Sequence, residues 1–100
     1  TLLQSCNKSA KSRKQECTIT SKDLIDLWES QKGRCFYTNI KLTTRPAESI
    51  SVSVERVDSK IGYTRENTVL ICNVINRMKS DLKLDLFLEM CTAVANNRKF

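Results

Sequence analysis

The segment SVSVERVDSKIGYTREN (residues 51–67) and the segment VLICNVINRMK (residues 69–79) carry the pattern that decides the fold of this chain. In the first segment Val52 and Val54 alternate with polar side chains, which is typical of a half-buried strand, and Gly62 indicates a turn. In the second segment the apolar residues recur at helical spacing, which predicts a helix that continues to about residue 80. The sequence therefore predicts a strand, a turn and a helix in succession.

One acidic residue of the predicted strand and three polar residues of the predicted helix can meet at one site. Glu55 supplies a carboxylate, Asn73 and Asn76 supply amide oxygens, and Lys79 supplies a cation. Carboxylate and amide oxygens are ligands for hard divalent cations, and a lysine can offset the charge of a phosphate that is being cleaved. Exposed strands and helices often carry the same residue types, so the spacing alone only permits such a site.

A further helix is predicted before this unit, over residues 20 to 33. Thr20 or Ser21 can cap it, Asp23 lies in its first turn near the positive end of the helix, and Gly33 ends it. Three apolar residues share one face of this helix: Leu24, Ile25 and Trp28.

The remaining segments give weaker patterns. The apolar run from Cys35 to Tyr37 predicts a short strand, and the stretch from Thr43 to Ser49, which contains Pro46, predicts a loop. A last helix is predicted from about Asp85 to Asn96. We expect its apolar stripe to pack against the core, and the stripe consists of Leu84, Phe87, Leu88, Cys91, Val94 and Ala95.

Composition limits the class of protein. One hundred residues, 40% of them hydrophobic, suffice for one small domain. Seventeen basic against eleven acidic side chains give a formal charge of +6, which favours a polyanionic partner such as nucleic acid. Acidic proteins attract a basic domain as well, so the charge alone does not choose between these partners.

No stretch reaches the roughly 18 apolar residues of a membrane-spanning helix, and no signal-peptide pattern opens the chain. Five cysteines form no CxxC pair, which favours a reduced, intracellular protein over a secreted disulfide scaffold. We therefore expect a soluble, intracellular protein without a membrane partner. The missing initiator methionine suggests a processed chain or a domain of a larger protein.

The first 19 residues form a basic extension that precedes a domain predicted over residues 20–100. In structure, the extension is predicted to be either a helix with a basic face or a flexible arm. In function, it is either a solvated tail or a segment that contacts the DNA backbone. Its basic residues near the N-terminus are Lys8, Lys11, Arg13 and Lys14.

The two segments quoted first, together with QKGRCFYTNIKL (residues 31–42), resemble the HNH endonuclease superfamily. More narrowly, they resemble a branch common in phages and large DNA viruses, in which the strand reads Ser-x-Asp-Arg-Ile-Asp and Gly-Tyr and Asn follow. The resemblance extends over about residues 20 to 95. It implies an α+β protein with a small ββα-metal domain and flanking helices.

The resemblance also implies roles for individual residues. Glu55 matches the acid of the first motif, Asn67 the asparagine that braces the loop, Asn76 the metal-binding residue of the third motif and Lys79 the lysine that follows it. Arg56 stands where the family usually has the histidine that activates water. This chain has no histidine, and an arginine remains protonated at neutral pH, so the general base of the family is missing.

Zinc braces many proteins of this family through two CxxC pairs. Here only Cys35 and Cys72 remain, one from each pair, and two thiolates cannot complete a tetrahedral structural site. Completion of the site by Cys6 and Cys17 would require an unusual spacing. We therefore expect buried neutral thiols and no structural zinc.

The function implied is metal-dependent DNA cleavage with one Mg²⁺ or Mn²⁺ ion held by Glu55 and Asn76. Arg56 and Lys79 would contact the scissile or a neighbouring phosphate, Asn67 would fix the loop, and Asp58 would be a further ligand or a proton acceptor. The residues expected to contact DNA are Lys8, Lys11, Arg13, Lys14, Arg56, Asn73, Arg77 and Lys79.

Two other functions are compatible with the sequence. A catalytically degenerate HNH-fold domain that binds DNA or serves in assembly would explain both the missing histidine and the halved cysteine pairs. The joint presence of Glu55, Asn67, Asn76 and Lys79 favours the nuclease over this alternative. A basic protein–protein module within a larger complex is the third alternative, and a metal bound to Glu55 would separate the nuclease from both.

Overall fold

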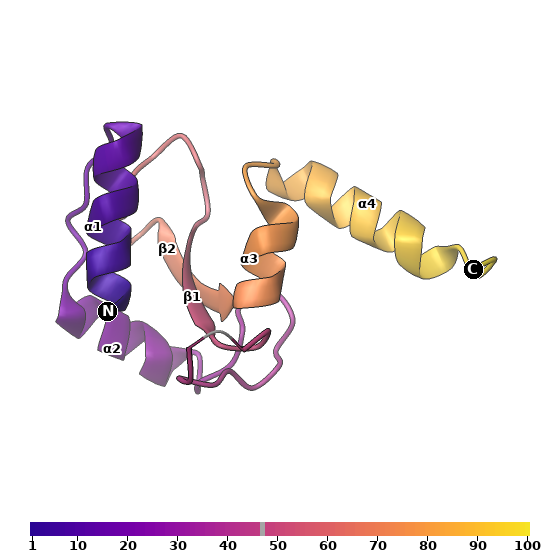
Figure 1. Cartoon of the computed structure of the whole chain (residues 1–100), viewed down its shortest axis with the longest axis horizontal. Coiled ribbons are helices and arrows are strands. Elements are labelled where there is room, and N and C mark those ends of the chain that lie inside the picture. The colour runs from indigo at the N-terminus through magenta and orange to yellow at the C-terminus, as the bar shows by residue number, and fades with distance from the viewer. Residues whose placement is uncertain (47) are drawn as a thin grey trace.

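Two antiparallel strands and the helix that follows them form the centre of the structure, a computed structural model that describes residues 1–46 and 48–100. Figure 1 shows this sheet between α1 and α3. The elements in chain order are α1 (Leu2–Arg13), α2 (Ser21–Ser30), β1 (Val52–Arg56), β2 (Thr68–Cys72), α3 (Asn73–Lys79) and α4 (Leu84–Asn96).

The second strand was not predicted from the sequence. β1 and β2 pair with Val52 opposite Cys72, Val54 opposite Leu70 and Arg56 opposite Thr68. Every residue of β2 is buried, so the strand has no polar face and its apolar run merges with that of α3. The prediction of a helix from residue 69 was therefore wrong for the first four residues, and the helix begins at Asn73.

The predicted helix after residue 20 is confirmed as α2, and its start is fixed by a capping box. Thr20 Oγ1 accepts a hydrogen bond from Asp23 N at 3.1 Å, and the Asp23 carboxylate accepts one from Thr20 N at 2.9 Å. Leu27 is buried in the core, whereas Ile25 is 58% exposed, so the buried face is centred differently from the one predicted. α2 ends at Ser30, three residues before Gly33, whose φ of +67° favours glycine.

The segment from Cys35 to Tyr37 is a turn and not the predicted strand. Cys35 N donates to Ile40 O at 2.8 Å, Asn39 N donates to Cys35 O at 2.9 Å, and an isolated bridge joins Arg34 to Lys41. Phe36 N donates to Leu70 O of β2 at 2.9 Å, but the neighbouring amides bond within the turn, so the segment forms no ladder with β2. The predicted loop from Thr43 to Ser49 has no helix or strand in its described residues, and Ala47 lies outside them.

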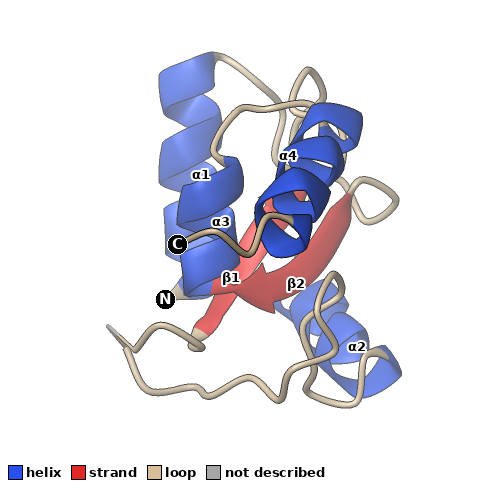
Figure 2. Ribbon diagram, turned by 90° about the vertical axis from the view of Figure 1, so that its right-hand side faces the viewer, coloured by secondary structure: helices blue, strands red, loops and turns tan. Residues whose placement is uncertain are grey.

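The first 19 residues pack closely against the ββα unit (Figure 2). α1 buries Cys6 and Ala10, and the chain after it lies beside the turn between the strands, where Tyr63 N donates to Glu16 O at 3.0 Å. A Cβ atom at Gly62 would lie 2.0 Å from Glu16 O, so only glycine permits this approach. The helix, and not the flexible arm, is therefore the form that the N-terminal residues adopt.

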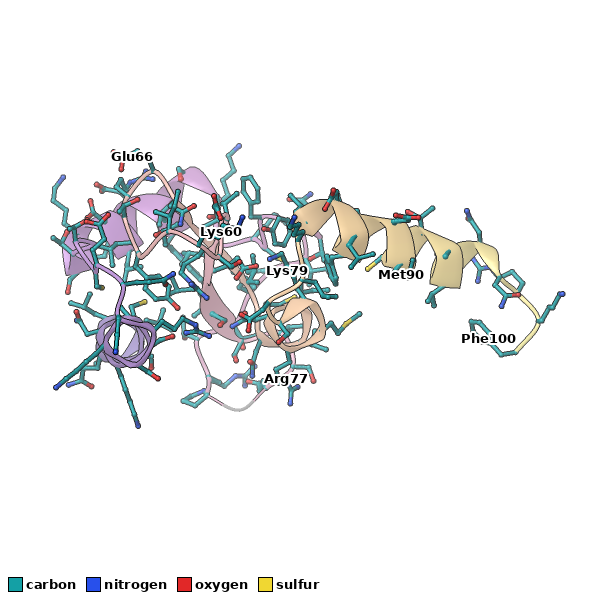
Figure 3. The ribbon with its side chains drawn as sticks, turned by 90° about the horizontal axis from the view of Figure 1, so that it is seen from above. Lys60, Glu66, Arg77, Lys79, Met90 and Phe100 are labelled. Atoms are coloured by element: carbon teal, nitrogen blue, oxygen red, sulfur yellow. The ribbon has the colours of Figure 1, made fainter. Side chains whose placement is uncertain are left out.

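The predicted last helix is confirmed as α4, but its apolar stripe does not pack against the core. Figure 3 shows α4, with Met90 labelled, extending away from the other elements toward Phe100. Phe87 is its one buried residue, whereas Leu88 is 50% and Val94 62% exposed. Periodicity identified the helix correctly, but it does not indicate what covers the apolar face. None of the helices described is long and apolar enough to span a membrane.

Candidate active site

A buried ion pair between β1 and α3 lies at the centre of the candidate site. Lys79 Nζ lies 3.0 Å from Glu55 Oε2, and the two side chains are only 2% and 8% exposed. Oε2 accepts no hydrogen bond from the described residues, so the contact is one of charge and not of hydrogen-bond geometry. Lys79 is thus placed as the partner of Glu55 and not, as expected from the sequence, at a surface where DNA phosphates can reach it.

Asn76, one helical turn from the start of α3, lines the same cavity as Glu55. Its Nδ2 donates to the Ser53 hydroxyl at 2.6 Å, which fixes the amide and leaves its oxygen for another ligand. The structure therefore brings together the two residues that the sequence predicted as metal ligands.

The donors at this position suit a hard cation with few protein ligands. Glu55 offers a buried carboxylate, whose Oε2 faces the Lys79 ammonium at 3.0 Å, and Asn76 offers an amide oxygen. No group of three or more Cys, Asp and Glu residues that could hold a metal exists in the described part of the chain. Mg²⁺ usually binds through one or two carboxylates and keeps several waters, so these residues fit it, with water and substrate as the remaining ligands.

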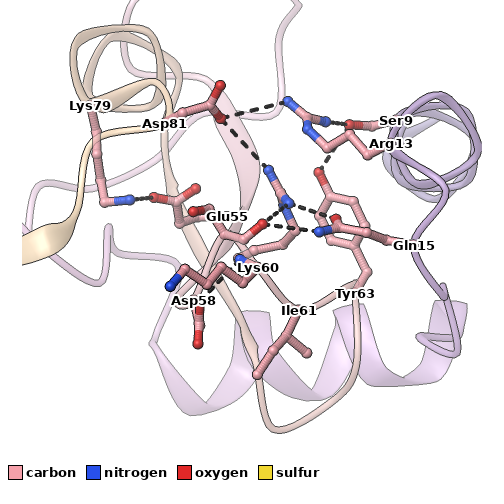
Figure 4. Close-up of polar contacts among 12 residues, drawn as sticks. Ser9, Arg13, Gln15, Glu55, Asp58, Lys60, Ile61, Tyr63, Lys79 and Asp81 are labelled. Atoms are coloured by element: carbon pink, nitrogen blue, oxygen red, sulfur yellow. Dashed lines mark hydrogen bonds and ion pairs between the residues drawn. The ribbon is translucent and has the colours of Figure 1, made fainter.

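Arg56 of β1 contacts the segment after α1 through Gln15, which Figure 4 labels, and protein groups hold its guanidinium. Nη1 donates to Gln15 Oε1 at 2.6 Å and to the Ser59 carbonyl at 2.7 Å. The guanidinium also lies over the Tyr63 ring, 5.6 Å from its centre, and Nη2 lies 4.0 Å from Asp81 Oδ1. Arg56 is therefore a fixed, buried cation that presents one edge to the cavity.

Asn67 fixes the turn between the strands by four hydrogen bonds. Its Oδ1 accepts from Asp58 N at 2.9 Å, and its Nδ2 donates to the carbonyls of Asp58, Ile61 and Gly62 at 3.0, 3.3 and 3.0 Å. A buried amide that satisfies four backbone groups sets the conformation of the whole turn. This arrangement corresponds to the bracing role that the resemblance implied for Asn67.

A polar cavity of about 380 Å³ collects these groups between α1, β1 and α3. Three arginines and two carboxylates face it, together with Tyr63 and Asn76. The residues that line it are Ser9, Arg13, Val54, Glu55, Arg56, Tyr63, Asn76, Arg77, Ser80 and Asp81.

Asp58 and most of the expected DNA contacts lie outside this cavity. The Asp58 carboxylate accepts from Lys60 N at 2.9 Å and lines a neighbouring hollow with Lys83. Asn73 is the first residue of α3 and is not among the residues that line the cavity. The exposed lysines of the N-terminal segment, Lys8, Lys11 and Lys14, lie along and just after α1.

Three residues of the site were not predicted from the sequence, namely Gln15, Tyr63 and Asp81. Gln15 and Tyr63 contact Arg56 from the segment after α1 and from the turn, and Asp81 follows α3. Gln15 and Asp81 lie in no motif, whereas Tyr63 belongs to the Gly-Tyr motif, to which no role in the site was assigned. Only the folded chain brings the three residues together. The hydrogen bond between Arg56 and Gln15 joins residues that lie far apart in the sequence, so no local sequence pattern predicts it.

Tyr37 lies near Glu55 and is not a candidate proton acceptor. Its buried hydroxyl has no hydrogen-bond partner among the described residues. Burial, then the negative charge of Glu55 and finally Cys35 raise the pKa of Tyr37 to about 12. The phenol therefore remains protonated at neutral pH and cannot take a proton from water.

Two of the five cysteines, Cys35 and Cys72, lie in contact, and the described residues contain no four-sulfur cluster. Cys72 Sγ lies 3.8 Å from Cys35 Sγ, and both thiols are buried. Burial, and then the charge of Cys17, raise the pKa of the Cys6 thiol to about 11. At that pKa Cys6 is a neutral thiol at neutral pH.

We predict that a strong zinc chelator leaves the melting temperature of the protein unchanged, because no described group of residues supplies four zinc ligands. The check is thermal unfolding with and without chelator, beside elemental analysis of the purified protein. Stoichiometric zinc together with unfolding on its removal would contradict the prediction.

The strands, the following helix and the cavity define an α+β protein with the ββα architecture of HNH endonucleases. The structure superposes on the HNH restriction endonuclease PacI with a TM-score of 0.66, at 24% sequence identity, over 92% of this chain and 72% of that chain. This likeness confirms the fold predicted from the sequence.

A similar sequence occurs in the uncharacterized protein R423 of Acanthamoeba polyphaga mimivirus. The two are 29% identical over 85 residues, which are 85% of this chain and 14% of that protein. This chain thus spans a small part of the length of the curated relative it matches. No family model matches the chain.

Proposed function

We propose that this chain is a metal-dependent DNA endonuclease that hydrolyses phosphodiester bonds. The observation that carries the proposal is the cavity in which the buried Glu55 carboxylate and the Asn76 amide face the same space as three arginines. Hard oxygen donors beside several cations are the groups needed to hold a divalent metal against a phosphate. The ββα fold, which the nuclease PacI shares, supports the same function.

Glu55 and Asn76 would hold one Mg²⁺ or Mn²⁺ ion. The bound ion would supply positive charge that polarises the phosphoryl group. Lys79 would hold the Glu55 carboxylate in position through the ion pair between them. Both side chains are buried, so this role of Lys79 requires no contact with DNA. Asn67 maintains the turn that leads from β1 to β2.

Arg56 and Arg77, which both line the cavity, would bind the phosphate. Hydrolysis joins a water oxygen to phosphorus and breaks one P–O bond, while the water loses a proton and the leaving oxygen gains one. Arginine cannot accept the proton, so it passes to a carboxylate or to bulk water. Two arginines that face the phosphate stabilise the charge that develops in this step.

The basic surface of α1 would extend the contact along the DNA backbone. We expect the association constant for a short duplex to fall about a hundredfold between about 50 and about 200 mM salt, as for a protein with roughly four phosphate contacts. Fluorescence anisotropy of a labelled duplex measures this slope. Lys8→Gln should reduce the slope by about one unit, whereas Lys22→Gln on α2 should not. An affinity independent of salt would contradict the prediction.

The geometry of Arg56 gives one specific reason to consider a second function. The residue at the usual histidine position is an arginine fixed by Gln15 and Ser59, and Glu55 is already paired with Lys79. An HNH-fold domain that binds DNA without cleaving it, or that serves in assembly, would have this arrangement. Such a domain would bind a duplex with the same dependence on salt.

Plasmid nicking separates the two functions. Supercoiled plasmid incubated with the protein and Mg²⁺ or Mn²⁺ should be converted to the open circular form, and a chelator should prevent the conversion. Binding without conversion under any divalent cation would favour the non-catalytic domain.

A further inference from the structure

Arg13 and Arg56 point at the same atom from two different elements. The Nη2 atoms of Arg13, from α1, and of Arg56, from β1, each lie 4.0 Å from Oδ1 of Asp81 (Figure 4). Two guanidinium groups that converge on one anionic oxygen form a fork that suits any oxyanion of similar size. The three residues line the cavity described above.

The two arginines are held in this position by other protein groups. Arg56 is buried, and its Nη1 is occupied by Gln15 and the Ser59 carbonyl. Arg13 Nη1 donates to the Ser9 hydroxyl, one turn earlier in α1. With Nη1 so engaged, the Nη2 atoms of the buried Arg56 and of the 42% exposed Arg13 both face Asp81, and an anion that replaces the Asp81 oxygen meets both arginines.

Asp81, in contrast, is loosely held. Its side chain is 76% exposed, it lies in the link between α3 and α4, and 4.0 Å is too long for a hydrogen bond to either arginine. Ion pairs of such exposed groups contribute little, because water and salt screen them. An anion that forms charge-assisted hydrogen bonds with both arginines can therefore displace the Asp81 carboxylate.

The charges around the cavity favour this exchange. Glu55 is neutralised by Lys79 at 3.0 Å, so Asp81 is the one remaining carboxylate among the lining residues. Arg13, Arg56 and Arg77 face the same space. Departure of Asp81 leaves three arginines around a polar cavity, an arrangement that suits a phosphate group.

We propose that Arg13 and Arg56 form a phosphate clamp, and that Asp81 occupies the clamp in the free protein and is displaced when a DNA phosphate binds. The choice of DNA as the ligand rests on the proposed function, whereas the phosphate clamp itself does not. Asp81 thereby lowers the affinity for DNA and restricts binding to ligands that form hydrogen bonds with both arginines.

The clamp can be tested with inorganic phosphate alone, without DNA or divalent metal. The side-chain Nε–Hε signals of Arg13 and Arg56 in NMR spectra of the full chain should shift on titration with phosphate and reach saturation. Asp81→Asn should lower the dissociation constant for phosphate about threefold to tenfold, since a competing carboxylate is removed. Absence of a saturable shift at both arginines, or an unchanged dissociation constant in Asp81→Asn, would overturn the proposal.

A double-mutant cycle tests the clamp with DNA. Asp81→Asn should raise the affinity for a short labelled duplex about threefold to tenfold, whereas Glu89→Gln, which removes an exposed acid on α4, should change it less than about twofold. With Arg13→Gln in place, the gain from Asp81→Asn should fall to half or less on a logarithmic scale. An equal gain with and without Arg13 would show a general effect of charge and would overturn the clamp.

The two proposals fail separately. A protein that binds phosphate through Arg13 and Arg56 but never nicks plasmid retains the clamp and loses the nuclease. A protein that nicks plasmid but shows no phosphate binding at these arginines retains the nuclease and loses the clamp.

Discussion

Replacement of Lys79 with methionine is expected to lower the free energy of unfolding by about 3–5 kcal/mol, a large part of the stability of a domain of this size. The ammonium of Lys79 lies 3.0 Å from the buried Glu55 carboxylate, and the lysine is 2% exposed. Methionine fills a similar volume but leaves the carboxylate in the protein interior without its cation. Urea unfolding followed by circular dichroism measures the loss.

Two further variants isolate the ion pair. Lys83→Met removes an exposed lysine four residues later and should change the free energy of unfolding by less than about 0.5 kcal/mol. Glu55→Gln combined with Lys79→Met replaces both charges and should recover most of the loss, because a buried ion pair is often no more stabilising than neutral groups of its size. A double variant as unstable as Lys79→Met would show that the pairing of charge is not what the lysine provides.

Replacement of Arg56 with histidine is expected to give a nicking rate at least equal to that of the parent, with a gain of up to about 10²–10⁴-fold if the imidazole reaches the attacking water. Histidine is the residue that the resemblance implies at this position, and a neutral imidazole can accept the proton that arginine cannot. The rate of conversion of supercoiled plasmid measures the effect.

Arg56→Ala is the matched control for the histidine variant. It should lower both DNA affinity and nicking rate, because a charge-assisted contact with phosphate is lost. Both variants also lose the contacts with Gln15 and Ser59, so their folded fractions must be measured first. An Arg56→His protein that is folded and binds DNA, yet shows no nicking beside an inactive parent, would contradict the assignment of Glu55 and Asn76 to a working metal site.

The parts of the fold that were predicted are those whose signals are local. The Thr20 cap, the alternation that located β1 and the periodicity of α4 each lie within one element. The half-buried strand that the alternation predicted was wrong in its polar side, because β1 buries Glu55 and Arg56 as well as Val54. β2 was missed because a fully buried strand lacks the alternation of polar and apolar residues by which strands are recognised. The exposed stripe of α4 was misplaced because periodicity reports a face but not its partner.

The residues of the site also fall into those that a local motif predicts and those that only the folded structure brings together. Glu55, Asn67 and Asn76 were predicted because a short motif carries each of them, and the structure places Glu55 and Asn76 in one cavity. The burial of Lys79 and the contact of Arg56 with Gln15 depend on packing between distant segments. A pattern within one segment cannot predict that residues 15 and 56 are in contact, because they belong to different segments.

The most direct test of the proposed nuclease is plasmid nicking by the Glu55→Gln/Lys79→Met variant, which should remain folded without the carboxylate. With Mg²⁺ or Mn²⁺ the parent should nick supercoiled plasmid, and Glu66→Gln, which removes an exposed acid in the turn before β2, should match it. The double variant should be slower by at least about a hundredfold, as for loss of a principal electrostatic group, and chelator should stop the parent. Nicking by the folded double variant at the parental rate, or by the parent in chelator, would contradict a metal-dependent site at Glu55.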